Sequence, residues 1–509
     1  MKTGRVFLVG AGPGAPGLIT VRGLECLRSA DVILYDNLCN PSLLREASSQ
    51  AQIIFAGKHA GAKSLTQEHI HNLMVRHARA GRMVVRLKGG DPFLFGRGAE
   101  EALHLRKHRI PFEIVPGVTS AIAVPAYAGI SVTHRDHASG VAMITAQENP
   151  NKTGEALDYR SLAGFPGSLV VLMAMTSLAE VSRKLIAAGK PSSTPVAVIS
   201  SGTRGFQQTV TGNLDNIVSR VRQKGLKPPS LAVIGEVVKC RRQLKWFEDR
   251  PLFGKRIIVT RTREQASRVA GRLLEMGAEV IELPTIEIRQ VKSASLQRAV
   301  REIENWNWVI FTSPWGVEYF LDEVLAQRGD VRALANARLG VIGPETESKL
   351  KERGLSADLM PRVHTAEALA RQFGIQNSEF RIQNSRILLP RSEIGRDVVE
   401  KTLRKLGAKV QPLVIYRNVR PRLTWEIEAL ERVGADVITF MSSSTAENFA
   451  KLLQDPKVFS VSTRRVLRRC KFISIGPTTS ATLRKLGFRV HGEAKPHTLH
   501  GLIRCLERL

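Results

Sequence analysis

A loop made of two glycines, an acid and a proline is the strongest candidate for chemistry in this chain. Gly89-Gly90-Asp91-Pro92 follows Met83-Val84-Val85, an apolar run that predicts a short buried strand. Because glycine has no Cβ, a ligand could approach the backbone there, and Asp91 could accept hydrogen bonds beside it. Open α/β sheets bind small molecules at the carboxyl ends of their strands, so this loop predicts part of a ligand site. An ordinary turn is the alternative.

Polar residues also follow other predicted strands in the same half. Asp36 closes the second apolar run, Lys58 closes the third, and Thr119 and Ser120 come after Pro116-Gly117, where a helix should begin. Taken singly, each could be a solvated loop charge or a helix cap. The amides and hydroxyls at a helix start can also bind an anion or a carboxylate. Four consecutive strand ends with polar groups therefore favour a cleft.

Strand and helix patterns alternate through the first half, which predicts α/β layers that position these loops. The predicted strands are apolar runs at residues 6–9, 31–36, 53–58, 83–85, 112–115, 141–145, 168–173, 195–199 and 231–234. A charged segment that ends at Pro251 follows, and a new strand pattern begins at Ile257. We therefore predict two domains, residues 1–250 and 251–509.

The first glycine loop allows a second hypothesis. Gly10-Ala11-Gly12-Pro13-Gly14-Ala15 fits the G-x-G-x-x-A pattern after a strand, which is typical of dinucleotide-binding enzymes. Pro13 weakens this hypothesis, because proline removes one of the backbone N–H groups that would hold a pyrophosphate. A dinucleotide-dependent oxidoreductase remains an alternative from these residues alone.

The second half contains an internal repeat. Residues 257–288 read strand, turn, helix and strand, and residues 387–418 repeat that order at a near-constant spacing. The near-constant spacing predicts two similar α/β modules rather than a solenoid. Hydroxyl residues stand at the strand-to-helix turns of both copies: Thr312, Ser313, Thr346, Ser442, Ser443 and Thr478. Each could be a helix cap, whereas several such turns that face one gap would form an anion site.

Composition limits the class of protein. The chain has 509 residues with 43% hydrophobic content, and its five cysteines form no Cys-x-x-Cys pair, which is typical of a globular protein of a reducing cytoplasm. We expect no secretory signal and no membrane span. The net charge of +29 is spread over both halves and indicates a polyanionic partner. A non-catalytic nucleic-acid-binding protein is one alternative, although aromatic residues are few and no nucleic-acid motif is visible. A polycarboxylate substrate is a second alternative, and a solvated basic surface without a partner is a third.

The motifs of the first half together resemble one family. In order they are Val9–Gly14, Tyr35-Asp36, Gly89–Phe93 with Gly96-Arg97-Gly98, Pro116–Ser120, Thr133–His137 and Gly235–Val238. This set resembles uroporphyrinogen-III C-methyltransferases of the tetrapyrrole methylase family. The resemblance implies two α/β lobes with S-adenosyl-L-methionine in the cleft between them, and not a nicotinamide fold.

The resemblance also implies roles for individual residues. Asp36 would be the proton acceptor and Lys58 the proton donor. The implied cofactor site consists of Pro13, Gly89, Gly90, Asp91, Leu94, Thr119, Ser120, Met173 and Gly202. We expect Arg86, Arg97 and Arg135 to bind substrate carboxylates.

Some positions depart from the family pattern. Ala15, Ala146-Gln147 and Ala174 replace residues that the family usually has, which bears on cofactor affinity. His134 and His137 lie three residues apart and suggest a metal, but the sequence provides no evident third ligand. We therefore expect no metal.

The second half resembles uroporphyrinogen-III synthases. Ile387–Arg391, Glu393–Asp397, Val414–Arg417 and Ile475–Thr479 are the segments that carry this resemblance. It implies two lobes joined by a two-stranded connector. One lobe would combine about residues 251–286 with residues 420–509. Tyr416 would help the hydroxyl of a linear tetrapyrrole to leave. Thr312, Ser313, Ser442, Ser443 and Thr478 would bind substrate.

The two resemblances describe consecutive reactions. The synthase would cyclise hydroxymethylbilane to uroporphyrinogen III, and the methyltransferase would convert that product to precorrin-2, on the sirohaem and cobalamin branch. A polycarboxylate substrate accounts for the net charge better than RNA does. We expect small-molecule tetrapyrrole substrates, no nucleic-acid or membrane partner, and a homodimer formed through the methyltransferase half.

Overall fold

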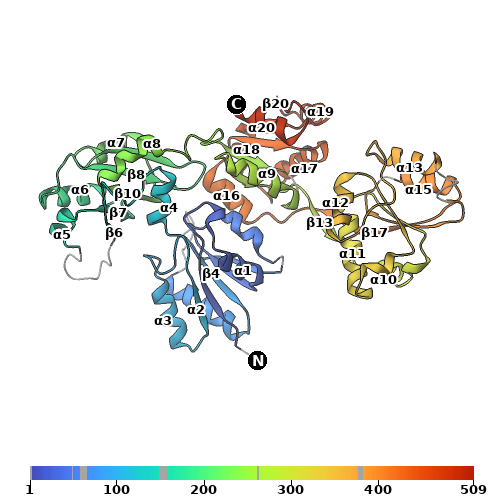
Figure 1. The fold of residues 1–509 in the computed structure, drawn as a ribbon, viewed down its shortest axis with the longest axis horizontal. Helices are drawn as coiled ribbons and strands as arrows, with labels where there is room; N and C mark the ends of the chain where they lie inside the picture. The colour runs from blue at the N-terminus through green and yellow to red at the C-terminus, as the bar shows by residue number, and fades with distance from the viewer. Residues whose placement is uncertain are drawn as a thin grey trace. The chain divides into compact units, whose positions relative to one another are not determined.

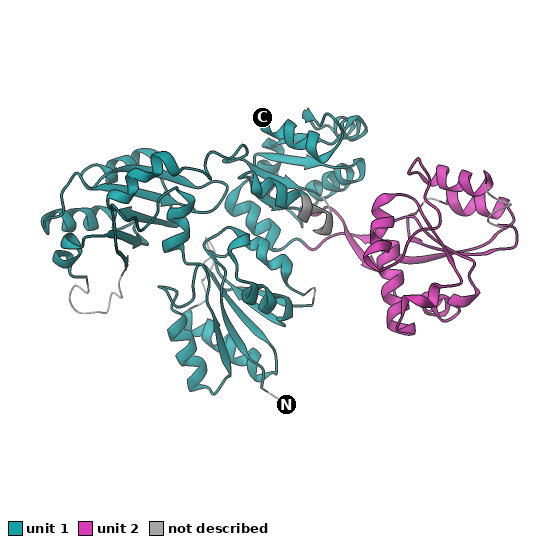
Figure 2. Ribbon diagram, viewed as in Figure 1, with its two compact units in different colours: residues 1–283, 423–509 teal, residues 284–422 magenta. Residues whose placement is uncertain are grey.

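The computed structural model describes residues 3–48, 50–57, 66–147, 157–260, 263–375, 382–395 and 397–509. The chain forms two compact units, Met1–Leu283 with Leu423–Leu509, and Pro284–Arg422 (Figure 2). The described residues form four five-stranded sheets, so the α/β fold class is confirmed. No helix in the described part of the chain is long and apolar enough to cross a lipid bilayer.

The first sheet is parallel and has the order β3-β2-β4-β1-β5. Its strands are β1 (Val6–Gly10), β2 (Val32–Tyr35), β3 (Gln52–Phe55), β4 (Val84–Lys88) and β5 (Phe112–Val115). The helices around it are α1 (Val21–Ser29), α2 (Gln67–Arg79), α3 (Gly98–Lys107) and α4 (Ser120–Tyr127). Figure 1 shows α2 and α3 beside β4. The central strands are buried because α1 packs on one face and α2 with α3 on the other.

The strand order argues against the dinucleotide hypothesis. In that fold the first strand pairs with the second, whereas here β1 lies between β4 and β5. The Gly10 loop also leads into a short 3-10 turn, Pro16–Leu18, and not into a long helix. A helix N-terminus that could hold a pyrophosphate is therefore missing directly after this loop.

The second sheet is mixed and has the order β6-β7-β10-β8-β9, in which only β6 and β7 pair in parallel. Its strands are β6 (Val141–Thr145), β7 (Ser168–Leu172), β8 (Pro195–Ser200), β9 (Gln208–Asn213) and β10 (Ser230–Ile234). The helical segments of this region are α5 (Tyr159–Gly164), α6 (Leu178–Ala187), α7 (Ile217–Lys224), the 3-10 helix η3 (Glu236–Cys240) and α8 (Arg241–Leu244).

The third sheet belongs to the same compact unit and the fourth sheet forms the other unit. The third consists of β11 (Arg256–Val259), β12 (Glu279–Glu282), β18 (Val437–Phe440), β19 (Lys471–Ser474) and β20 (Val490–Glu493), in the order β12-β11-β18-β19-β20. The fourth consists of β13 (Glu287–Gln290), β14 (Trp308–Phe311), β15 (Arg338–Val341), β16 (Arg386–Ser392) and β17 (Lys409–Val419), in the order β13-β17-β16-β14-β15. Only β13 pairs antiparallel, with β17.

The predicted internal repeat is confirmed, with an exchange of strands between its copies. Strands β11, β12, β14 and β15 come from the first copy, and β16, β17, β18 and β19 from the second. Each sheet places two strands of one copy beside two strands of the other. The third sheet has β12-β11 beside β18-β19, and the fourth has β17-β16 beside β14-β15, which is the same order with the copies exchanged. The third sheet therefore joins residues before 284 to residues after 422, as the resemblance implied. The chain passes from one unit to the other after Leu283 and again after Arg422. The antiparallel β13–β17 pair lies next to both of these points in the chain and matches the expected two-stranded connector.

Helices cover the sheets of the second half. They are α9 (Arg263–Glu275), α10 (Ala294–Arg301), α11 (Pro314–Arg328), α12 (Pro344–Glu352), α13 (Ala366–Ile375), α15 (Val398–Lys405), α16 (Trp425–Val433), α17 (Ser443–Gln454), α18 (Val461–Arg469), α19 (Pro477–Lys485) and α20 (Leu499–Glu507). Helix α16 also contacts the first sheet's region: Trp425 is buried in the same core cluster as Tyr35, Cys39, Leu43 and Leu44.

Candidate active sites

One cavity of about 340 Å³ collects most of the predicted site residues of the first half. All nine residues of the implied cofactor site border it: Pro13, Gly89, Gly90, Asp91, Leu94, Thr119, Ser120, Met173 and Gly202. Asp36, Arg86 and Arg97 border it as well, whereas Arg135 is not among its lining residues. Lys58 lies outside the described residues. A volume of this size falls in the range of small-molecule sites.

The two glycines after β4 serve different purposes. A Cβ on Gly89 would lie 2.4 Å from the Cβ of Leu38, so close packing excludes a side chain there. Gly90 has a φ of +69°, and the nearest atom to a Cβ built on it is the Ser120 nitrogen at 3.7 Å. Gly90 therefore needs glycine for its backbone conformation and exposes bare backbone to the cavity.

The Asp91 carboxylate braces the loop internally. Its Oδ1 accepts hydrogen bonds from the backbone N–H groups of Phe93 at 2.7 Å and Leu94 at 3.1 Å. Its Oδ2 accepts from the N–H of Gly117 at 3.0 Å, which ties the loop after β4 to the loop after β5. Asp91 is therefore a positioning residue for both loops.

The remaining wall of the cavity comes from α4 and the second sheet. Thr119 caps α4 by accepting from the Ala121 N–H at 3.3 Å, and Ser120 is the first residue of that helix. Met173 has a φ of +55° directly after β7. A Cβ on Gly202 would lie 2.3 Å from Val124, so this glycine is fixed by contact with α4. Both lobes thus contribute to one cavity.

A buried ionic network lies beneath the strand ends. The Arg86 Nη2 lies 3.2 Å from Oδ2 of Asp36, and its Nε lies 3.2 Å from Oε1 of Glu101. The same Glu101 oxygen accepts from the Lys88 ammonium at 2.9 Å. Burial lowers the pKa of Lys88, although Glu101 opposes this shift. Asp36 keeps partial contact with solvent, with 22% of its side chain exposed.

Sequence reasoning missed Glu101 and Lys88. Lys88 directly precedes the Gly89–Phe93 motif, and a lysine at the end of an apolar strand pattern was a usable signal. Glu101 shares the buried stripe of α3 with Gly98, Ala102 and Leu105. A glutamate on the buried face of a helix needs a buried partner, but Glu100 beside it gives the same sequence signal.

The predicted arginines have different surroundings. Arg97 has a φ of +58° and pairs with Glu100 at 2.6 Å on the surface, with its side chain 57% exposed. Arg135 is exposed on the loop after α4. Arg86 is buried and its charge is already shared between two carboxylates.

The compact unit Pro284–Arg422 contains its own cavity of about 380 Å³. Thr312 and Tyr416 border it, together with Thr365, Arg391 and Ser392. The hydroxyls of Tyr416 and Ser313 are 2.7 Å apart, and Ser313 also caps α11. Burial raises the pKa of Tyr416, so its phenol stays protonated at neutral pH.

The predicted hydroxyl residues of the other unit also lie together. Ser442 caps α17 by accepting from the Thr445 N–H at 3.3 Å. The Ser443 hydroxyl donates to the carbonyl of Thr478 at 3.3 Å. The helix-cap alternative therefore holds for Ser313 and Ser442. A common substrate site for both sets of hydroxyls stays a prediction.

Comparison with known proteins identifies two family matches. Residues 5–218 match the model of tetrapyrrole (corrin/porphyrin) methylases, and residues 267–504 match that of uroporphyrinogen-III synthase HemD. A protein of Ruminiclostridium josui named porphyrin biosynthesis protein HemD is 33% identical over 497 residues, which are 96% of this chain and 95% of the relative.

Other similar proteins match mainly the first half. The uroporphyrinogen-III C-methyltransferase of Bacillus subtilis (strain 168) is 42% identical over 70% of this chain and 72% of its own length. The S-adenosyl-L-methionine-dependent uroporphyrinogen III methyltransferase of Methanosarcina barkeri is 48% identical over 46% of this chain and 92% of its own length. Among solved structures, a Thermus thermophilus uroporphyrin-III C-methyl transferase is 38% identical over 46% of this chain and 99% of its own, with a TM-score of 0.40.

Proposed function

The chain belongs to the tetrapyrrole methylase family over residues 5–218 and to the uroporphyrinogen-III synthase family over residues 267–504, and we propose that its halves catalyse consecutive reactions. The second half cyclises hydroxymethylbilane to uroporphyrinogen III. The first half methylates that product twice with S-adenosyl-L-methionine and forms precorrin-2, which leads to sirohaem and cobalamin. A metal has no assigned part in either reaction.

The cavity between the first two sheets is the observation that carries this proposal. Its lining combines bare glycine backbone, the hydroxyls of Thr119 and Ser120, and apolar side chains such as Leu94 and Met173. Such a mixture suits a ligand with an aromatic base, a sugar and an amino-acid end. These residues would hold S-adenosyl-L-methionine, which supplies a methyl group on a sulfonium that is already a good electrophile.

Proton transfer is the chemistry that the protein itself would provide. A pyrrole carbon that gains a methyl group must lose a proton, and Asp36 at the cavity edge is the proposed acceptor. Arg86 contacts Asp36 directly and would orient its carboxylate. Lys58 is the proposed proton donor.

Charged groups around the cavity would select the substrate. Uroporphyrinogen III carries many carboxylates, and Arg97 borders the cavity with an exposed guanidinium. Arg97 and Arg135 are proposed to bind substrate carboxylates, since arginine binds them in a bidentate manner. Arg86 is also proposed to bind a substrate carboxylate. It would do this while it keeps its contact with Asp36, because its charge is already paired with Asp36 and Glu101.

In the second half, Tyr416 would donate a proton to the departing hydroxyl, which leaves as water while the new ring bond forms. Ser313 would orient the phenol through their hydrogen bond. Thr312, Ser442, Ser443 and Thr478 are proposed to hold substrate carboxylates. Much of the rate would come from holding a flexible chain in the cyclising geometry, so Tyr416 is helpful rather than essential.

One experiment tests both halves. The full chain is incubated with hydroxymethylbilane, with and without S-adenosyl-L-methionine, and the products are separated by isomer and methyl content. We expect uroporphyrinogen III without the methyl donor and a dimethylated product with it, at two donor molecules per product. Recovery of only the symmetric isomer I in both reactions would refute the synthase assignment, and an unmethylated product in both would refute the methyltransferase assignment.

A matched pair of variants tests the role of Asp36. Asp36→Asn should slow methyl transfer by about 100-fold or more, the usual contribution of a general base, while cyclisation is unchanged. Asp215→Asn removes an exposed acid of the same type away from the cavity and should change neither rate. Equal methyl transfer in Asp36→Asn and the unsubstituted chain contradicts this role.

The assembly and the compartment are further parts of the proposal. We expect a homodimer through the methyltransferase half, which light scattering of the purified chain would measure. All five cysteines are free thiols in the structure, which agrees with a cytoplasmic enzyme.

A further inference from the structure

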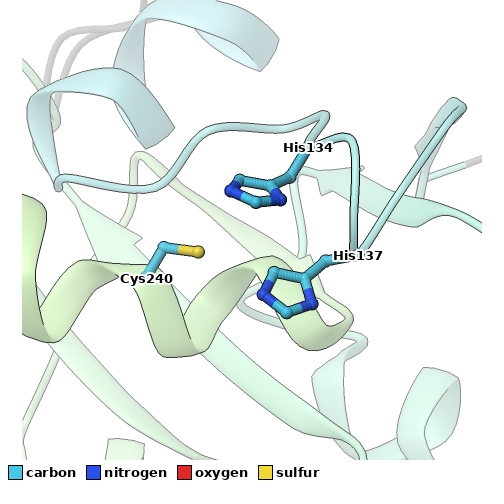
Figure 3. Close-up of side chains that lie close together, drawn as sticks. All are labelled: His134, His137 and Cys240. Atoms are coloured by element: carbon cyan, nitrogen blue, oxygen red, sulfur yellow. The ribbon is translucent and has the colours of Figure 1, made fainter.

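A cluster of metal-ligating side chains lies in the second lobe of the first half. His134 and His137 are on the loop between α4 and β6, and Cys240 ends the 3-10 helix η3. Figure 3 shows the Cys240 sulfur directed toward the space beside the two imidazole rings. One nitrogen from each ring and the sulfur all lie within 4.8 Å of one another. In the described residues this is the only group of three histidine, cysteine or acidic side chains that converges so closely.

The fold therefore provides the third ligand that the sequence did not reveal. Cys240 is far from the His134–His137 pair in the chain, and only packing of η3 against this loop brings the thiol to the rings. Two imidazoles and a thiolate are a ligand set that Zn²⁺ prefers. In a tetrahedral zinc site such ligand atoms lie roughly 3.3–3.6 Å apart, as follows from usual zinc bond lengths. Side-chain rotations of the exposed His137 and of the half-buried His134 and Cys240 would close the remaining difference.

The loop geometry holds both rings on one side. The backbones of His134 and Ala138 exchange two hydrogen bonds, at 2.9 and 2.8 Å, and close a tight turn. The two rings are stacked, with centroids 4.7 Å apart. Two imidazoles that face the same space from one rigid turn need little reorganisation to share a cation.

The surrounding charges permit a cation. The Asp136 carboxylate lies 3.7 Å from Nδ1 of His134 and adds a negative charge beside the cluster, while that nitrogen accepts a hydrogen bond from the Asp136 backbone N–H at 3.1 Å. The two cations next to Cys240 in the chain are already paired: Arg241 with Glu248 at 2.5 Å and Lys239 with Glu236 at 2.6 Å.

We propose that His134, His137 and Cys240 bind one zinc-class divalent ion with three protein ligands and an exchangeable fourth position. None of the three residues borders the methyltransferase cavity. The ion would clamp the loop before β6 to the segment η3–α8, which leads out of the first half. Its consequence is stabilisation of this lobe, because a ligand bound only by the folded state shifts the unfolding equilibrium.

Cobalt provides a direct test on the full chain. After treatment with a chelator, the protein is titrated with Co²⁺, which takes the place of zinc and gives a charge-transfer band when a thiolate is bound. We expect the band to saturate at one equivalent, to disappear when Zn²⁺ is added, and thermal unfolding to shift upward with the metal. No thiolate band in the unsubstituted chain would overturn the proposal.

Two variants assign the band to this cluster. Cys240→Ser should abolish it, and His137→Gln should weaken Co²⁺ binding by roughly 100-fold or more. The matched controls are Cys505→Ser, a partly exposed free thiol elsewhere, and His108→Gln, directly after α3 beside His104; both variants should bind Co²⁺ as the unsubstituted chain does. A band that survives Cys240→Ser would overturn the assignment. Methyl transfer measured on each variant verifies that the lobe is folded.

Discussion

Lys88 and Glu101 form a buried ion pair beside the methyltransferase cavity, with the ammonium nitrogen 2.9 Å from the carboxylate Oε1. The same oxygen accepts from Arg86, which in turn contacts Asp36. One carboxylate from α3 thus balances two cations of β4, and the network ends at the proposed proton acceptor. Strand β4, which ends directly before the glycine pair, therefore depends on helix α3, which follows it in the chain.

Glu101→Gln should be strongly destabilising. The amide keeps the shape of the side chain but leaves two buried cations with less compensation, which costs about 3–5 kcal/mol when one partner of a buried pair is lost. Denaturant unfolding of the full chain, followed in its first transition, measures the effect. Glu100→Gln is the control, since its pair with Arg97 is exposed and should contribute about 1 kcal/mol or less. Equal losses in the two variants would mean that Glu101 has no special role.

Asp91→Asn should weaken cofactor binding without affecting the second half. The variant loses at least one charge-assisted hydrogen bond to the loop, with a cost of about 1.5–3 kcal/mol. Because this loop borders the cofactor cavity, we expect the affinity for S-adenosyl-L-methionine to fall by about 10-fold or more. Calorimetric titration measures it, and the cyclisation rate serves as the internal control. Unchanged affinity would show that the contact with Gly117 does not shape the site.

The sequence predicted most of the sheets because their strands are apolar. Runs at 112–115 and 141–145 correspond to β5 and β6 residue for residue. Strand β9 was missed because Gln208–Asn213 is polar and lies at the edge of its sheet, where only β8 holds it. Tertiary pairing, and not the local pattern, makes that segment a strand.

The candidate site was predicted at positions where the residue type indicates a particular backbone conformation or a polar contact. Gly90, with its positive φ, and the described polar groups after β2, β4 and β5 converge on one cavity, as parallel strand ends must. Glu101 was not predicted because Glu100 and Glu101 look alike in the sequence. Only the rotation of α3 decides which of the two becomes buried. Cys240 is similar, since its neighbours in space come from a distant loop.

Tyr416→Phe should slow cyclisation by about 10- to 100-fold while the product remains isomer III. Burial raises the pKa of the phenol above its ordinary value of about 10, so ionisation would remove the proton only at a still higher pH. The rate of the unsubstituted chain should therefore show no loss from this group between about pH 6 and pH 10. Initial rates across this range measure both effects.

Tyr319→Phe is the matched control for Tyr416. Its ring centroid lies 6.4 Å from that of Tyr416, but it is not among the residues that border the cavity of this unit. Cyclisation by Tyr319→Phe should equal that of the unsubstituted chain. If both variants are equally slow, the loss reflects packing of the connector, and a proton-donating role for Tyr416 is excluded.

Tyr35 of the methylase segment should be energetically coupled to helix α16 of the synthase segment, which belongs to the same compact unit. Its hydroxyl lies 2.5 Å from Oε2 of Glu428 on α16, and Arg432 of the same helix donates to the carbonyl of Asn37 at 2.7 Å. These contacts hold both neighbours of Asp36, so Glu428→Ala should slow methyl transfer and cost about 1–3 kcal/mol, because a buried hydroxyl loses its acceptor. A double-mutant cycle with Tyr35→Phe measures the coupling, expected at about 0.5–3 kcal/mol. Strict additivity of the two substitutions, in stability and in methyl-transfer rate, would show that α16 does not support the Asp36 loop.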